Sequence, residues 1–152
     1  MLMVLILLLI LLCIVLAVCI IEYDLLKISN KKLNNADHIL FVLKKWDNRR
    51  KEEKDFLEKR LILENHMKIA VYGYGILGRR LIRELEGSQI ERKYYIDRNA
   101  LKIQADIPVF MDTEDLPEVD VIIVTVVSQF CEIKSVLNKK VKYLVVNIED
   151  LL

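Results

Sequence analysis

Apolar and polar positions divide the sequence into two unlike parts. Residues 1–21 contain no charged or polar side chain, no glycine and no proline. A helix rises about 1.5 Å per residue, so this stretch spans roughly 31 Å, the thickness of the hydrocarbon core of a bilayer. A helix buried inside a soluble protein usually keeps some polar positions, and this stretch has none. The pattern therefore predicts a transmembrane helix over residues 1–21.

The charges around this segment predict its orientation. The first basic residue is Lys27, and more basic residues follow. Because cytoplasmic flanks carry an excess of Lys and Arg, we expect a single-pass protein of the inner (cytoplasmic) membrane with its C-terminal part in the cytosol. The lipid bilayer is then the first expected partner. Leu16–Cys19 weakly resembles a bacterial lipoprotein box, but Val18 stands where a small residue is expected and no basic start precedes it.

Residues 22–66 are rich in interleaved acidic and basic side chains and predict a charged helical stalk or hairpin. We expect one helix to begin near Asn35, a turn at Asp47 and Asn48, and a second helix over about 51–64. Apolar residues of the first helix share one face: Ile39, Leu40, Leu43 and Trp46. This stripe can pack on the following domain or on a second copy in a homodimer, and the pattern does not choose between them.

Residues 67–152 alternate between short apolar runs and amphipathic segments. The runs predict strands at 68–72, 91–96, 107–110, 121–127 and 143–148, with helices over 79–86 and 129–140. Such strands are typical of a parallel sheet covered on both faces. With right-handed crossovers, the fold class is α/β: a doubly wound, five-stranded parallel sheet of order 3-2-1-4-5. A ligand crevice is expected beyond the carboxyl ends of the first and fourth strands.

A glycine-rich motif lies between the first strand and its helix. Three of the four glycines in the protein fall within it, and the six residues are Gly73, Tyr74, Gly75, Ile76, Leu77 and Gly78. This G-x-G-x-x-G, placed between a strand and a helix, is typical of a dinucleotide-binding turn. The first glycine permits the turn, the second lets a phosphate approach the backbone, and the third lets the helix pack closely. The helix N-terminus then attracts the anion.

Further candidate contacts follow other strands. Asp97 ends the second strand, 19 residues after Gly78, where a carboxylate can accept hydrogen bonds from a ribose. This favours NAD slightly over NADP, although Arg98 next to it can meet a 2′-phosphate. The alternative for Asp97 is a residue that starts a turn. Thr125, near the end of the fourth strand, is expected to line the crevice.

Composition narrows the classes of function. A formal net charge of +1 gives no reason to expect nucleic-acid binding. The two histidines, His38 and His66, stand apart from cysteines and carboxylates at metal-ligand spacing, so we expect no metal site. We find no complete catalytic constellation, and whether the chain is an enzyme stays open at this stage.

The stretch VYGYGILGRRLIREL, followed by YYIDRNA, IPVF, LPEVDVIIVT and VVNIEDLL, resembles a known group. It is similar to the compact Rossmann modules of bacterial membrane proteins that process polysaccharides and nucleotide sugars. The resemblance covers roughly residues 67–152. It implies that Gly73, Gly75, Gly78 and Asp97 contact a nucleotide, either NAD(P) or a nucleotide sugar, and that a polysaccharide-biosynthesis enzyme is a partner.

Three hypotheses follow from the sequence. The first is a membrane-anchored module that binds NAD(P) or a nucleotide sugar as an accessory or regulatory component of envelope polysaccharide biosynthesis. The second is an oxidoreductase or epimerase subunit whose catalytic groups come from a partner chain. The third is a structural module that binds no nucleotide and mediates self-association.

Overall fold

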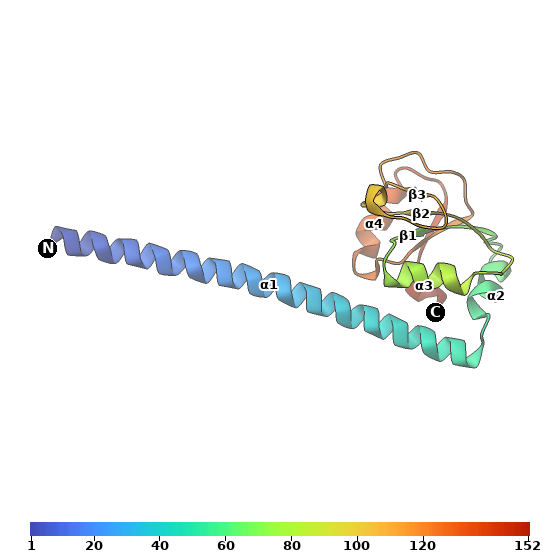
Figure 1. Ribbon diagram of the computed structural model, residues 1–152, viewed down its shortest axis with the longest axis horizontal. Coiled ribbons are helices and arrows are strands. Elements are labelled where there is room, and N and C mark those ends of the chain that lie inside the picture. Colours follow the sequence, from blue (N-terminus) through green and yellow to red (C-terminus); the bar gives the residue numbers. More distant parts are fainter. The chain divides into compact units, whose positions relative to one another are not determined.

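The N-terminal part of the protein is one long helix. A computed structural model describes residues 1, 3, 4, 6 and 8–152. Helix α1 (Leu2–Glu52) is continuous (Figure 1). Its portion from Leu8 onward is long and apolar enough to cross a membrane, and none of its most apolar stretch is buried.

Two predicted helix boundaries are wrong. We expected a helix start near Asn35 and a turn at Asp47 and Asn48, yet α1 runs through both places. No glycine or proline precedes Gly73, so nothing in the backbone forces a break there. The chain instead leaves the helix after Glu52 and begins α2 (Phe56–Leu63).

The chain divides into two compact units, residues 1–37 and 38–152. The second unit contains five strands, which are β1 (Lys68–Tyr72), β2 (Glu91–Ile96), β3 (Val109–Phe110), β4 (Val121–Val124) and β5 (Leu144–Asn147). All pairings are parallel, and the order is β3-β2-β1-β4-β5. The predicted fold class and strand order are therefore confirmed.

Helices cover both faces of the sheet, and those between consecutive strands connect them. They are α3 (Ile76–Glu84), the short 3₁₀ helices η1 (Ala100–Lys102) and η2 (Val127–Gln129), α4 (Phe130–Leu137) and α5 (Ile148–Leu151). Helices α2, α3 and α5 contribute to one apolar core together with the end of α1, and α4 contributes to the other. Adjacent strand residues such as Ile122 and Ile123 belong to opposite cores, as the alternation of side chains along a strand requires.

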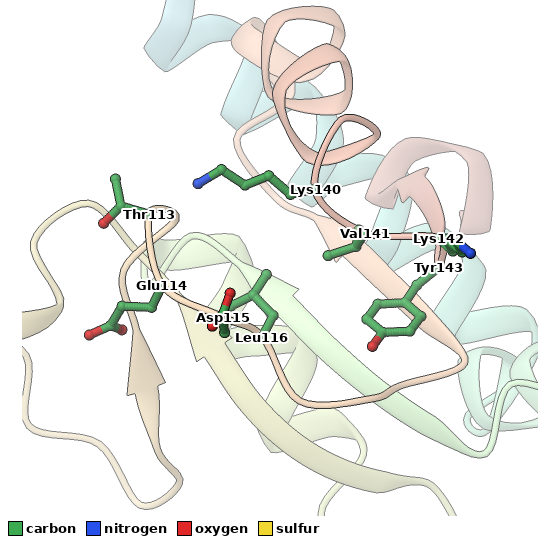
Figure 2. Close-up of a pocket in the computed structure, with 8 residues that line it drawn as sticks. All are labelled: Thr113, Glu114, Asp115, Leu116, Lys140, Val141, Lys142 and Tyr143. Atoms are coloured by element: carbon green, nitrogen blue, oxygen red, sulfur yellow. The ribbon is translucent and has the colours of Figure 1, made fainter.

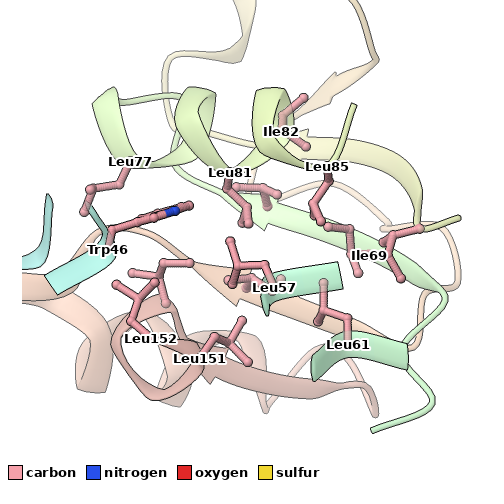
Figure 3. Packing of buried hydrophobic residues seen from close by; sticks show 14 of the residues in the cluster. Trp46, Leu57, Leu61, Ile69, Leu77, Leu81, Ile82, Leu85, Leu151 and Leu152 are labelled. Carbon is pink, nitrogen blue, oxygen red and sulfur yellow. The ribbon is translucent and has the colours of Figure 1, made fainter. Parts of the chain in front are cut away.

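The apolar stripe of α1 packs on this domain (Figure 3). Val42 and Trp46 are fully buried, and Ile39 packs against the same core. The Trp46 indole Nε1 donates a hydrogen bond to Glu84 Oε2 at 2.9 Å. Leu40 remains 63% exposed. The last turns of α1 therefore belong to the core of the second unit.

Candidate functional site

The predicted phosphate-binding turn, residues 73–78, links β1 to α3 at the carboxyl end of the central strand. We call it the glycine turn. Gly73 has φ +101°, a conformation that side-chain-bearing residues rarely adopt. A Cβ atom there would also lie 2.8 Å from Val126 Cγ2 and 2.9 Å from Thr125 Oγ1. Gly73 is therefore required both by the backbone conformation and by the packing of the residues that follow β4.

Gly78 permits a close approach within the turn. A Cβ atom at this position would lie only 2.0 Å from the Gly73 carbonyl oxygen, a backbone atom that has little freedom to move. The first turn of α3 is therefore packed directly against Gly73, the residue that follows β1. The sequence predicted that Gly78 lets the helix pack closely. The atom it packs against is the Gly73 carbonyl oxygen, at the other end of the glycine turn.

Gly75 differs from the other two glycines. Its φ is −80°, which any residue can adopt, and a Cβ atom there would meet nothing within 4 Å. Gly75 is exposed and caps the N-terminus of α3, and the Ile76 side chain is 56% exposed. The first backbone N–H groups of a helix have no acceptor within the helix, so they are available to an anion in this open space.

The other two residues of the motif point into the protein. Tyr74 contacts the Tyr95 ring edge-on, with centroids 4.8 Å apart, and its hydroxyl donates to the Gln104 carbonyl oxygen at 3.1 Å. Leu77 is 3% exposed and belongs to the core beneath α3 (Figure 3). Of the side chains between the glycines, only that of Ile76 is exposed at the candidate site.

Asp97 braces the glycine turn from the end of β2. Its Oδ2 accepts a hydrogen bond from the Tyr74 backbone N–H at 2.9 Å, and its Oδ1 accepts one from the Asn99 N–H at 2.8 Å. The carboxylate thus starts a turn and also fixes the glycine turn. Each carboxylate oxygen has a second lone pair, so Asp97 can still accept the predicted hydrogen bond from a ribose hydroxyl.

Thr125, the residue after β4, supports the glycine turn. The residue is 6% exposed, and its hydroxyl lies 2.9 Å from the Tyr72 carbonyl oxygen and 3.1 Å from that of Gly73. A hydroxyl donates one hydrogen bond at a time, so the two carbonyls share this donor. The neighbouring Val126, rather than Thr125, lines the depression beside the turn.

A small depression of about 130 Å³ lies at the expected crevice. Its lining residues come from the ends of β1 and β2 and from the segment after β4: Tyr72, Asp97, Arg98, Asn99, Val126, Gln129 and Ile133. Drug-sized ligands usually occupy pockets of several hundred Å³, so this depression by itself holds only part of a nucleotide.

Two of the lining residues, Tyr72 and Arg98, contact carboxylates. Arg98 Nε lies 3.5 Å from Asp112 Oδ2, and its Nη2 lies 4.0 Å from Glu132 Oε1. The Tyr72 hydroxyl donates to Asp112 Oδ2 at 3.1 Å. Burial first, and then the charge of Asp112, raises the pKa of Tyr72. Sequence reasoning missed Asp112 and Glu132, because only the fold brings them beside Arg98.

A larger hollow of about 470 Å³ lies elsewhere on the domain (Figure 2). It lies between two loops, residues 113–116 and residues 140–143. The first segment lies between β3 and β4, and the second lies between α4 and β5. No residue of the predicted nucleotide site lines it.

No family model, curated protein or solved structure matches this chain. Among residues 1, 3, 4, 6 and 8–152, no group of three His, Cys, Asp or Glu side chains is placed to hold a metal ion.

Proposed function

We propose that the protein is a membrane-anchored module that binds the diphosphate of NAD, NADP or a nucleotide sugar at the glycine turn. The long apolar helix α1 supports the membrane anchor. The parallel sheet supports the ligand position, because such sheets bind ligands beyond the carboxyl ends of their strands.

The open space around Gly75 carries the proposal. The fold itself requires Gly73 and Gly78, since a side chain at either would collide with the chain. It places no such demand on Gly75, where nothing lies within 4 Å of a Cβ atom. A ligand phosphate that approaches the N-terminus of α3 gives the missing reason for a glycine at this position.

The charges beside the turn favour NAD over NADP. Asp97 lies at the end of β2, and Arg98 already lies near two carboxylates, those of Asp112 and Glu132. The 2′-phosphate of NADP would therefore lie near the Asp97 carboxylate. Arg98, the cationic residue next to Asp97, already lies beside two other carboxylates. A ribose with free hydroxyls can instead donate to Asp97.

The wider role rests on the sequence resemblance of residues 67–152. It supports an accessory or regulatory role in envelope polysaccharide biosynthesis, in which the module presents or senses a nucleotide for a partner enzyme. The protein would act at the inner membrane with this domain in the cytosol, where nucleotides are abundant.

Titration of the full chain tests the proposal. The protein is reconstituted in phosphatidylcholine nanodiscs and titrated calorimetrically with NAD, NADH, NADP, NADPH and UDP-glucose. We expect saturable binding of at least one of them, and we expect Gly75→Val to weaken it by about tenfold or more. The matched control is Ser135→Val, an exposed small residue on α4, which should bind as the native chain does.

Two outcomes would change the assignment. If no nucleotide in the panel binds, the proposal is wrong, and a structural module becomes the better description. The observation that favours that alternative is the contact of Arg98 and Tyr72 with Asp112. If hydride transfer is measured only with a co-expressed partner, the protein is instead one subunit of an oxidoreductase.

A further inference from the structure

Another hollow lies between the last turns of α1 and helix α3, and all of its lining residues belong to the unit of residues 38–152. It measures about 410 Å³, and charged side chains alone line it: Arg50, Arg80, Arg83 and Glu84. None of these four residues lines the depression beside the glycine turn. We call this site the basic hollow.

Contacts with Trp46 and Asp47 fix two of the residues that line the basic hollow, Arg80 and Glu84. The Arg80 guanidinium lies 5.0 Å from the centre of the Trp46 ring and pairs with Asp47. Trp46 is fully buried, and its indole N–H holds Glu84. Arg80 and Glu84 therefore have fixed positions before any ligand arrives, which lowers the entropic cost of binding.

The positive charge of the basic hollow is not neutralised by the chain. Within the described residues, neither Arg50 nor Arg83 has an ion-pair partner; Arg83 Nε only donates to the Arg79 carbonyl oxygen at 3.3 Å. Asp47 pairs with Arg80. Glu84 accepts the indole N–H of Trp46 through Oε2, and its buried Oε1 has no hydrogen-bond partner among the described residues, so these two carboxylates offset two of the three arginine charges and leave one in excess. The C-terminus of a helix also attracts cations, but it carries only about half of a negative elementary charge. It therefore does not balance the charge of these guanidinium groups.

The excess of positive charge continues on the other side of Arg50. A neighbouring hollow, also of about 410 Å³, is lined by Asp47, Arg50, Lys51 and Lys54. Together the two hollows gather five cations around two carboxylates. Like charges held this close repel each other, and a bound anion relieves that repulsion.

We propose that the basic hollow binds a phosphate-bearing ligand with at least two negative charges. A guanidinium presents paired N–H donors that match the oxygens of a phosphate, and Arg50 and Arg83 each have donors free for this purpose. The same chemistry is offered by a free pyrophosphate group and by the headgroup of an anionic phospholipid. The site is independent of the nucleotide proposed for the glycine turn.

Calorimetric titration of the full chain in phosphatidylcholine nanodiscs tests this site. Every variant also carries Gly75→Val, so that phosphate binding at the glycine turn does not contribute. Inorganic pyrophosphate is the probe in one arm and dihexanoyl phosphatidic acid in the other, both at low ionic strength. We expect Arg50→Gln together with Arg83→Gln to weaken binding about tenfold or more.

The control removes the same amount of charge elsewhere. Lys139→Gln together with Lys142→Gln leaves the basic hollow intact and should change the affinity less than about twofold. If the double arginine variant does not fold, Arg50→Gln alone replaces it, because that exposed side chain makes no hydrogen bond among the described residues. Loss of affinity for either probe in the arginine variant supports the site and identifies the source of the phosphate. Equal losses in both double variants, or no binding of either probe, would overturn it.

Discussion

The three glycines of the glycine turn obey different physical constraints. Gly73 lies in a region of φ that favours glycine, and Gly78 faces a carbonyl oxygen at a distance that no Cβ atom tolerates. Gly75 has neither restriction. Sequence spacing predicted all three positions, but only the tertiary structure separates the two glycines that the fold requires from Gly75, which has open space around it.

This separation predicts opposite results for two alanine substitutions. Gly78→Ala should lower the free energy of unfolding by about 3 kcal/mol, since the new methyl group forces α3 away from Gly73. Gly75→Ala should change it by less than about 1 kcal/mol, because its methyl group points into open space. Urea denaturation followed by circular dichroism measures both. Similar losses in the two variants would contradict the assignment of separate roles.

At the scale of elements, the end of α1 is part of the domain core. Trp46 joins α1 to α3 through its buried ring and its hydrogen bond to Glu84, and Arg80 covers the ring. This packing explains why the helix continues through Asp47 and Asn48. The apolar stripe was visible in the sequence, but its partner surface on α2, α3 and α5 was not.

Removing the indole should loosen this end of α1. Trp46→Ala is expected to cost about 4 kcal/mol in unfolding free energy, because it empties a large buried site and leaves Glu84 without its donor. Leu40→Ala is the matched control, since Leu40 lies on the same helix and is 63% exposed. Hydrogen exchange of the amides in residues 42–52 provides the local measurement. Unchanged protection there in Trp46→Ala would show that the packing does not hold the helix.

At the scale of the whole molecule, one chain combines an apolar helix with an α/β domain. The helix is long enough to cross a bilayer, and the domain carries the candidate site. The basic residues that follow the apolar segment favour a cytosolic domain. Cys131 is exposed on α4 and reports on this orientation.

Labelling of Cys131 checks the orientation in intact cells. Cys13 and Cys19 are first replaced by alanine, so that Cys131 is the only thiol. A membrane-impermeant maleimide should react with the protein only after the inner membrane is permeabilised. A further Cys131→Ser change supplies the background signal. Full labelling before permeabilisation would place the domain on the outer side and remove the nucleotide supply on which the proposed function depends.

Local pattern was sufficient for most of the architecture. Alternation of apolar runs with amphipathic segments predicted the strand order, because right-handed crossovers leave few arrangements for parallel strands. The second half of the stalk was predicted less well. Its apolar stripe and charges fit a hairpin as well as a straight helix, and the choice depended on contacts with residues far away in sequence, such as Glu84.

The sequence by itself determined an apolar helix long enough for a membrane, a doubly wound parallel sheet and a glycine turn at the end of its first strand. These features follow from periodicity, from the lack of a side chain on glycine and from the length of an apolar run. Tertiary structure alone decided that Asp97 and Thr125 brace the turn, that Arg98 lies near two carboxylates, and that Arg50, Arg80 and Arg83 line one hollow. Those contacts join residues distant in the chain, and their distances depend on how the layers pack.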